Sequence, residues 1–204
     1  EKTNKNAFEM IRRDTIFTNV AVTEANQPWW EDKGIGEPAL DWQGAPCDPG
    51  KPAAHPNSRF TVSAKADPAY SSLSEATEGV PISAIVFGGR RKQLAPLVYE
   101  ANDWRHGVMI AASVASETTA AATGNVGVVR RDPMAMKPFC GYNFADYWQH
   151  WLSFADRSTQ LPKIFHVNWF RQDEQGRFLW PGFGENLRVI RWILDRCHGG
   201  VDAQ

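Results

Sequence analysis

The sequence predicts an α/β fold in which a mixed sheet is flanked by helices. The apolar segment 81–87 is typical of a buried strand, and residues 163–170 alternate well enough to predict a second strand. Two segments with apolar residues at helical spacing, 143–156 and 185–198, are typical of helices that cover a sheet. The chain has 204 residues, which is enough for one hydrophobic core, so we expect residues 1–204 to form a single partial domain.

The composition excludes several classes of protein. The chain is 43% hydrophobic and carries a net charge of −1, which is typical of a globular protein and argues against a surface that coats nucleic acid. It contains no signal peptide and no long apolar run, so we expect no membrane partner. Three cysteines without a C-x-x-C pair (Cys47, Cys140 and Cys197) indicate reduced thiols and a cytoplasmic location. The chain begins at Glu1 rather than Met, and we expect a fragment of a longer protein.

The first part of the chain predicts short strands separated by irregular segments. Residues 15–23 are rich in β-branched side chains and predict a strand. Residues 24–58 are poor in periodicity and rich in proline, glycine and tryptophan. Residues 45–60, with four prolines, predict a long irregular loop, which is typically functional or disordered. This loop ends at Asn57 and Ser58, and the strand-like RFTVSA begins at Arg59.

A pair of arginines follows the strand predicted for residues 81–87. That strand runs directly into Gly88-Gly89-Arg90-Arg91. Ligands of open α/β sheets bind at the carboxyl ends of strands, and arginine suits multidentate capture of phosphate or carboxylate. Arg59 and Arg90 are therefore candidate anion ligands, and the alternative for each is a surface salt bridge. Residues 94–101 predict the next strand.

A stretch of small residues comes after this strand. Residues 103–122 are rich in alanine and predict a helix. The segment 116–127 buries little apolar area and contains Gly124 and Gly127, which could act as hinges. It is either a mobile lid over a site or an exposed helix end with a flexible turn.

Aromatic residues gather in residues 161–188. A turn signal between Phe170 and Phe178 predicts a hairpin with a short return strand over residues 177–180, so that these two rings lie across it. Phe183 lies between two glycines just before a helix. Such rings could form a slot for a flat base, whose stacking contributes about 1–3 kcal/mol. Asn186 could add a donor and an acceptor. The alternative is an aromatic hairpin buried in the core.

The two predicted helices carry apolar faces that we expect to lie in the core. In residues 143–156 this face comprises Phe144, Tyr147, Trp148, Trp151, Leu152 and Ala155. In the last helix, which Gly199-Gly200 ends, it comprises Val189, Ile190, Ile193 and Leu194. We expect His166, in a predicted strand, to be a hydrogen-bonded core residue. The five histidines show no metal-binding spacing, and the sequence has no G-x-x-x-x-G-K-[ST] motif, so we expect no metal ligands in this chain.

Eleven segments resemble, in order, motifs of the GTP-dependent phosphoenolpyruvate carboxykinases. They are TIFTNVA, AAHPNSRF, IVFGGRR, PLVYEA, HGV, SETTAAA, RRDPMAMKPF, GYNF, HWLSFA, LPKIFHVNWFR and FLWPGFGEN. The resemblance covers nearly the whole chain, and RRDPMAM is similar to bacterial members. It implies part of the C-terminal, nucleotide-binding lobe of that fold. Departures at Lys92, Gln93, Thr118, Ala145 and Leu187 are expected to be tolerated.

The resemblance also implies the site residues. Asn57, Ser58 and Arg59 would bind phosphoenolpyruvate or oxaloacetate, and Arg59 would act in catalysis by balancing charge on the transferred phosphoryl group. Residues 116–127 would be the lid. The guanine nucleotide would be bound by Arg59, Arg90, Phe170, Phe178, Phe183, Gly184, Glu185 and Asn186. Of these, Phe170 and Phe183 would enclose guanine, and Phe178 would form a third wall.

The implied reaction converts oxaloacetate and GTP into phosphoenolpyruvate, GDP and carbon dioxide, as part of gluconeogenesis or anaplerosis. Mn²⁺ and Mg²⁺ would serve the full-length protein, which we expect to be a monomer. We expect the metal ligands and the phosphate loop of the family before Glu1, so the chain alone should not turn over. One alternative is a stand-alone guanine-nucleotide-binding module without catalysis, and another is a structural fragment without a ligand.

Overall fold

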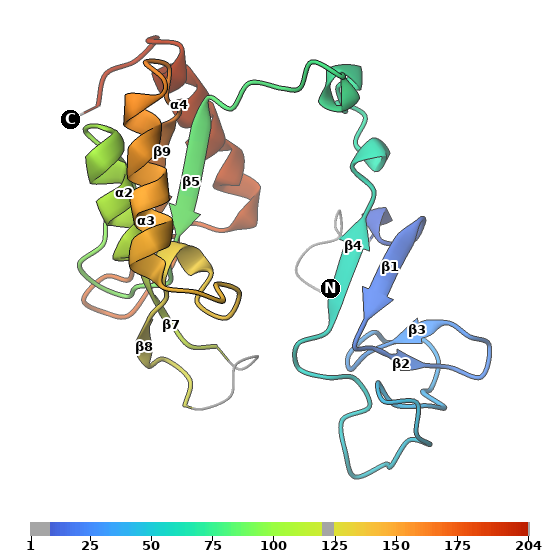
Figure 1. Ribbon diagram of the computed structural model, residues 1–204. Coiled ribbons are helices and arrows are strands. Elements are labelled where there is room, and N and C mark those ends of the chain that lie inside the picture. The colour runs from blue at the N-terminus through green and yellow to red at the C-terminus, as the bar shows by residue number, and fades with distance from the viewer. Residues whose placement is uncertain (1–8, 120–124, 204) are drawn as a thin grey trace. The chain divides into compact units, whose positions relative to one another are not determined.

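The computed structural model describes residues 9–119 and 125–203, which form two compact units (Figure 1). We call residues 9–80 unit 1, and residues 81–119 together with 125–203 unit 2. Each unit is described by itself. The expectation that residues 1–204 form one partial domain stays a prediction.

Unit 2 contains the mixed sheet that the sequence predicts. Its three strands are β5 (Ala84–Gly88), β6 (Val98–Glu100) and β9 (Lys163–Val167). The order is β5-β9-β6, with β9 parallel to β5 and antiparallel to β6. The helices of the unit are α2 (Trp104–Ala112), α3 (Phe144–Ser153) and α4 (Asn186–Cys197). The predicted α/β class is confirmed.

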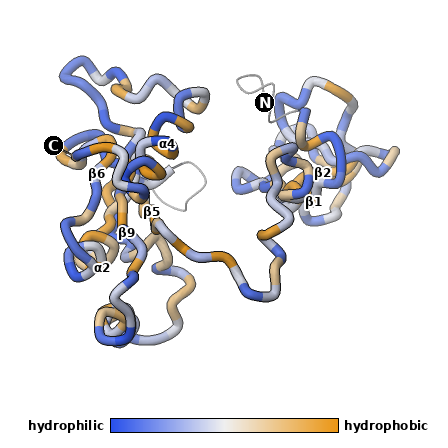
Figure 2. The backbone as a smooth tube through the Cα atoms, turned by 90° about the horizontal axis from the view of Figure 1, so that it is seen from above, coloured by the Kyte–Doolittle hydropathy of each residue, from blue (hydrophilic) through white to orange (hydrophobic). Residues whose placement is uncertain are grey.

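The central strand β9 buries side chains on both of its faces. Successive residues of a strand point to opposite faces, so Ile164 and Phe165 serve different layers. Ile164 packs against Ile110 of α2, and Phe165 packs against Val189 and Ile193 of α4. These residues are all buried. Helices therefore cover both faces of the sheet, and Figure 2 shows apolar colouring where β9 passes through the middle of the unit.

The helix predicted for residues 103–122 was wrong beyond Ala112. Residues Ala115–Glu117 form strand β7 instead, which pairs antiparallel with β8 (Val129–Arg131). Val114 is buried between the helix and this strand, and its carbonyl oxygen accepts a hydrogen bond from Asp132 N. Pairing with a distant segment thus overrides the helix propensity of the alanines.

The apolar helix faces are less buried than expected. No residue of α3 is fully buried: Tyr147 and Trp151 are half-buried, and Leu152 is exposed. In α4, Ile190 and Leu194 have exposed fractions of 43% and 48%. The expectation that the whole face of each helix lies in the core was wrong, because a sheet of three short strands covers one narrow row of side chains on each helix.

His166 lies in the core, as expected. It is buried and stacks on the Tyr99 ring, with 5.1 Å between ring centroids. The expected hydrogen bond is absent at Nδ1, which has no partner among the described residues, so that part of the expectation was wrong. Burial lowers the pKa of the His166 imidazole, so the residue is neutral at physiological pH.

Unit 1 is built from two antiparallel strand pairs. Strand β1 (Thr15–Thr18) pairs with β4 (Arg59–Val62), and β2 (Ala21–Val22) pairs with β3 (Pro28–Trp29). The single strand predicted for residues 15–23 is interrupted at Asn19, whose φ of 59° is incompatible with a strand. Among the described residues, no helix is long and apolar enough to cross a membrane.

An ion triad fixes the end of α4 to the sheet. The Glu100 carboxylate accepts from Lys163 Nζ at 2.7 Å and from Arg196 Nε at 2.5 Å. Burial alone would raise the pKa of this carboxyl group, but hydrogen bonds and positive charge from Arg196 and Lys163 outweigh burial, so the net pKa is lowered. The ionised carboxylate therefore stabilises the folded state.

We predict that Glu100→Gln lowers the free energy of unfolding by about 1–3 kcal/mol at pH 7, between the values for exposed and buried pairs. Because the folded-state pKa is depressed, the difference from wild type should be full above the ordinary glutamate pKa of about 4.3 and shrink as pH falls below it. Urea denaturation across this range measures it. The matched control is Asp195→Asn, which removes an exposed ion pair with Arg191 and should cost less than about 1 kcal/mol. Equal losses in both variants would contradict the role of the triad.

Candidate functional site

The carboxyl ends of two parallel strands define one edge of the sheet in unit 2. In the parallel register, Gly88 of β5 lies opposite Val167 of β9. The chain leaves β5 through Gly89 and Arg90, and it leaves β9 through Asn168. Binding sites of α/β sheets occur at such edges, because loops from neighbouring strands meet there.

The side chain of Asn168 joins the two loops. Its Oδ1 accepts from Arg91 N at 3.0 Å and from Phe170 N at 3.3 Å, and its Nδ2 donates to Arg91 O at 2.8 Å and to Ala95 O at 3.0 Å. With an exposed fraction of 1%, it is among the most buried residues described. Asn168 therefore fixes the arginine segment beside the start of the aromatic segment. Sequence reasoning missed this residue, although an amide directly after a buried strand is a usable signal.

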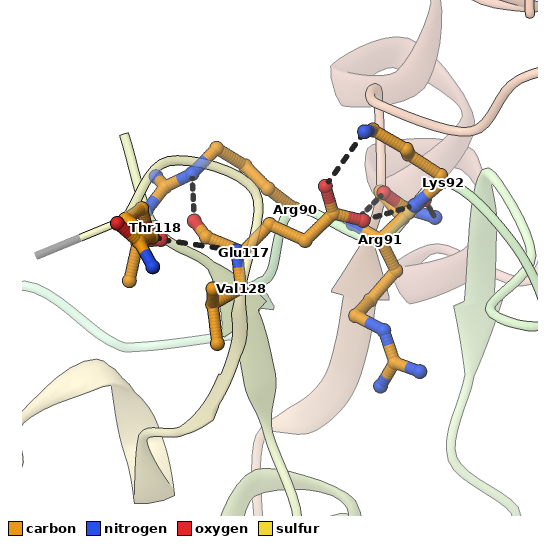
Figure 3. A network of polar contacts seen from close by, with 8 residues as sticks. Arg90, Arg91, Lys92, Glu117, Thr118 and Val128 are labelled. Carbon is orange, nitrogen blue, oxygen red and sulfur yellow. Dashed lines mark hydrogen bonds and ion pairs between the residues drawn. The ribbon is translucent and has the colours of Figure 1, made fainter. Parts of the chain in front are cut away.

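Arg90 is held by the neighbouring strand β7 (Figure 3). Its backbone N donates to Ser116 Oγ at 3.0 Å, and its Nε donates to the backbone oxygen of Glu117 at 3.0 Å. Gly89 allows this approach, because a Cβ there would lie 2.7 Å from Ala115 O. No ion pair of Arg90 occurs within the described residues. The salt-bridge alternative therefore does not describe Arg90.

The three phenylalanines of the predicted slot are exposed. Phe170 and Phe178 have exposed fractions of 45% and 57%, and Phe183 has 72%. The rings of Phe170 and Phe178 meet edge to face, with 5.8 Å between centroids and 86° between planes. The alternative of a core hairpin is contradicted for these three residues. Edge-to-face packing of the two rings is a favourable aromatic geometry, and both rings stay partly exposed.

The hairpin that carries Phe170 and Phe178 is less regular than predicted. Gly176 makes the expected turn with a φ of 77°. The returning segment, predicted as a strand, pairs through one isolated bridge between Gln172 and Phe178. The prediction of a return strand over residues 177–180 was therefore wrong.

The segment that presents Phe183 is anchored by two tryptophans. Trp169 and Trp180 stack with 5.8 Å between centroids, and Trp180 Nε1 donates to Asn186 Oδ1 at 2.9 Å. Gly182 then takes a φ of 136°, which side chains rarely tolerate, and the chain reverses into α4. Phe183 thus projects from a fixed base at the start of a helix, as predicted.

The residues after Phe183 have different environments. Gly184 has open space where a side chain would be, with no atom within 4 Å of an added Cβ. The Glu185 carboxylate is paired with Arg188 Nε at 2.6 Å. Oδ1 of Asn186 accepts from Trp180 Nε1, and its Nδ2 group carries the two donors of this side chain.

The remaining predicted site residues, Asn57, Ser58 and Arg59, belong to unit 1. Asn57 Oδ1 accepts from Arg59 Nε at 2.9 Å. The backbone nitrogens of Asn57 and Ser58 donate to Nδ1 and the oxygen of His55, both at 2.9 Å. Arg59 is exposed and forms no ion pair within the described residues. The hydrogen bond to Asn57 orients the guanidinium of Arg59, and the Nη groups remain for another partner.

The predicted lid, residues 116–127, is described only at its two ends. Ser116 and Glu117 belong to β7, and Thr118 forms hydrogen bonds with Gly127 and Val128. Residues 120–124 lie outside the described residues. The lid therefore stays a prediction.

Metal ligands and cavities were also sought. Across residues 9–119 and 125–203, no group of three or more His, Cys, Asp or Glu side chains could hold a metal ion. These residues do not fit Mn²⁺ or Mg²⁺. A cavity of about 920 Å³ lies in unit 1 beside the stacked rings of Phe17 and Trp30, and none of the predicted site residues lines it.

Comparison with known proteins gives consistent matches over the whole chain. The family model described as "Phosphoenolpyruvate carboxykinase C-terminal P-loop domain" matches residues 1–204. Phosphoenolpyruvate carboxykinase [GTP] of Anaeromyxobacter sp. (strain K) is 56% identical over 100% of this chain and 35% of its own length. The proteins of that name from Chlamydia muridarum and Chlamydia pneumoniae are 54% and 56% identical, over 98% and 99% of this chain and 34% of their own length. The chain thus spans about a third of these curated relatives.

We predict that Asn168→Ala lowers the free energy of unfolding by about 2–4 kcal/mol, because four backbone groups at the sheet edge lose their partner in a buried place. Urea denaturation measures the loss. The matched control is Asn143→Ala, which removes the N-cap bond of α3 to Ala145 N and should cost about 1 kcal/mol. A loss at Asn168 no larger than the loss at Asn143 would mean that the loops hold together without this amide.

Proposed function

Because the chain belongs to the family of GTP-dependent phosphoenolpyruvate carboxykinases, we propose that unit 2 supplies the guanine-nucleotide site of such an enzyme. The full-length protein would convert oxaloacetate and GTP into phosphoenolpyruvate, GDP and carbon dioxide in gluconeogenesis or anaplerosis. One observation carries the proposal. Asn168 holds together, at one sheet edge, the loop of Arg90 and the hairpin of the exposed Phe170 and Phe178. Arg90 forms no ion pair within the described residues, and the exposed Phe183 lies on the segment just before α4.

The aromatic residues suit a purine base. Guanine would stack between Phe170 and Phe183, and Phe178 would meet its edge, since the Phe178 ring stands at 86° to Phe170. Gly184, which has no side chain and no neighbour at that point, lets the base approach the backbone. Stacking alone does not distinguish purines, because every base has a π-face.

Asn186 supplies a reason for a preference for guanine. Its oxygen is occupied by Trp180 Nε1, so the ligand meets its N–H donors. Guanine carries the acceptor O6 where adenine carries the donor N6–H₂. A fixed donor at this place therefore favours guanine over adenine. The Glu185 carboxylate is engaged by Arg188, so Glu185 would contribute through its backbone.

The phosphates would be bound by arginine. Arg90 has its Nε committed to Glu117 O, and its two Nη groups can take phosphate oxygens. In unit 1, Asn57, Ser58 and Arg59 would bind oxaloacetate or phosphoenolpyruvate. Arg59 would also contact the nucleotide and balance charge on the transferred phosphoryl group.

Further proposals concern the full-length protein. Residues 116–127 would close as a lid that keeps water from the enolate formed by decarboxylation. Mn²⁺ and Mg²⁺ would be its cofactors, with their ligands outside residues 1–204, so we derive no step through them. We also propose a cytoplasmic monomer without nucleic-acid or membrane partners. The 204-residue chain should bind nucleotide without turnover.

We predict that GDP quenches the tryptophan fluorescence of the chain, since Trp169 and Trp180 support the slot, and that ADP binds more weakly. Phe183→Ala should weaken GDP and guanosine alike, by about 5- to 100-fold, because one stacking partner is lost. Arg90→Ala should weaken GDP by about tenfold or more and leave guanosine unchanged, because guanosine has no phosphate.

The control for the slot is Phe139→Ala, which removes a phenylalanine of unit 2 with an exposed fraction of 80% outside the site. It should leave both affinities unchanged. Unaltered GDP affinity in Phe183→Ala would show that the slot is wrongly placed. Binding without turnover supports the nucleotide site. Turnover of oxaloacetate and GTP by the chain would overturn its expected inactivity. No binding at all would favour the alternative of a structural fragment without a ligand.

A further inference from the structure

Glu117 contacts both ends of the segment formed by Arg90, Arg91 and Lys92 (Figure 3). Its backbone N donates to Arg90 O at 2.8 Å, and its backbone oxygen accepts from Arg90 Nε at 3.0 Å. Its carboxylate accepts from Lys92 N at 2.8 Å and lies 3.7 Å from Lys92 Nζ. One residue therefore fixes the beginning of this segment with its main chain and the end with its side chain.

The carboxylate of Glu117 is placed differently from that of a surface salt bridge. Its side chain is 13% exposed, and its short contact is with a backbone N–H, whereas the Lys92 side chain is 56% exposed and its ammonium group lies farther away. On the opposite side, Lys92 O accepts from Gln172 N of the aromatic hairpin at 2.9 Å. The segment is thus braced between β7 and the hairpin, and Glu117 supplies the brace from β7.

We propose that Glu117 is a positioning residue for phosphate binding by Arg90, an inference that rests on the proposed nucleotide site. Arg90 holds a phosphate with its Nη groups only if its backbone and Nε are fixed. The Glu117 side chain is long enough for its carboxylate to accept a hydrogen bond from Lys92 N. This hydrogen bond fixes the backbone that follows Arg90. Its charge works against anion binding, and the nearby ammonium of Lys92 offsets that charge.

This role makes a prediction opposite to that of a simple field effect. A carboxylate near an anion site repels the anion, so removing its charge should tighten GDP binding if charge is all that matters. If the length of the side chain matters, a neutral side chain of the same length should preserve GDP binding, and a charged but shorter side chain should weaken it. Glu117→Gln keeps the length and an acceptor oxygen, whereas Glu117→Asp keeps the charge and loses one methylene group.

The experiment measures dissociation constants of GDP and guanosine for the 204-residue chain and these two variants. In Glu117→Asp, the constant for GDP should rise about three- to tenfold, which corresponds to one hydrogen bond, while that for guanosine stays unchanged. In Glu117→Gln, both constants should stay within about twofold of wild type. Asp195→Asn, which alters an exposed carboxylate of α4, is the control and should change neither.

Three results would overturn the inference. Tighter GDP binding in Glu117→Gln with wild-type affinity in Glu117→Asp would assign Glu117 a field effect alone. Equal weakening of GDP and guanosine in Glu117→Asp would assign it a general structural role, and unchanged affinities in both variants would assign it none. Failure of the wild-type chain to bind GDP is a separate result, which overturns the proposed nucleotide site and the inference with it.

Discussion

The carboxamide of Asn168 is the interaction on which the site of unit 2 depends. Two parallel strands end side by side, and the backbone groups just beyond them have no further strand to pair with. Burial of such groups without partners costs about 1–3 kcal/mol each. One amide offers two donors and one acceptor, and here it bonds Arg91 on both sides, Phe170 and Ala95. The arginine and aromatic loops therefore keep one relative geometry.

That fixed geometry explains how apolar rings can remain exposed. An uncovered phenylalanine forgoes the stabilisation of burial, so the segment that carries it must be held by other contacts. The stacked Trp169 and Trp180 belong to the core cluster around Phe165, and Trp180 also bonds Asn186. Phe183 extends from this base through Gly182. The segment that carries Phe183 is therefore held by contacts within the protein, and in the proposed nucleotide site this would reduce the ordering cost of binding.

The features that the sequence predicted correctly are those specified locally. Apolar, β-branched runs indicated the strands, and the glycines around Phe183 indicated an exposed loop. The errors came from contacts with distant segments. Strand β7 forms because β8 pairs with it, although its alanine-rich surroundings favour a helix. Ile190 and Leu194 follow the helical pattern, but their burial depends on what lies over α4. For Asn168 the sequence offers only the weak signal of an amide directly after a buried strand, and its partners are mainly backbone groups of another loop.

The two candidate anion-binding arginines are prepared in the same physical way. In unit 2, Arg90 Nε donates to a backbone oxygen of Glu117, and in unit 1, Arg59 Nε donates to the side-chain oxygen of Asn57. An arginine side chain carries about 2 kcal/mol of rotamer entropy, part of which is lost when it binds a ligand. A neutral acceptor at Nε fixes the plane of the guanidinium without cancelling its charge, as a carboxylate would. Each guanidinium is thus held in one plane by a neutral partner, and in the proposed site its Nη groups would take the oxygens of an anion.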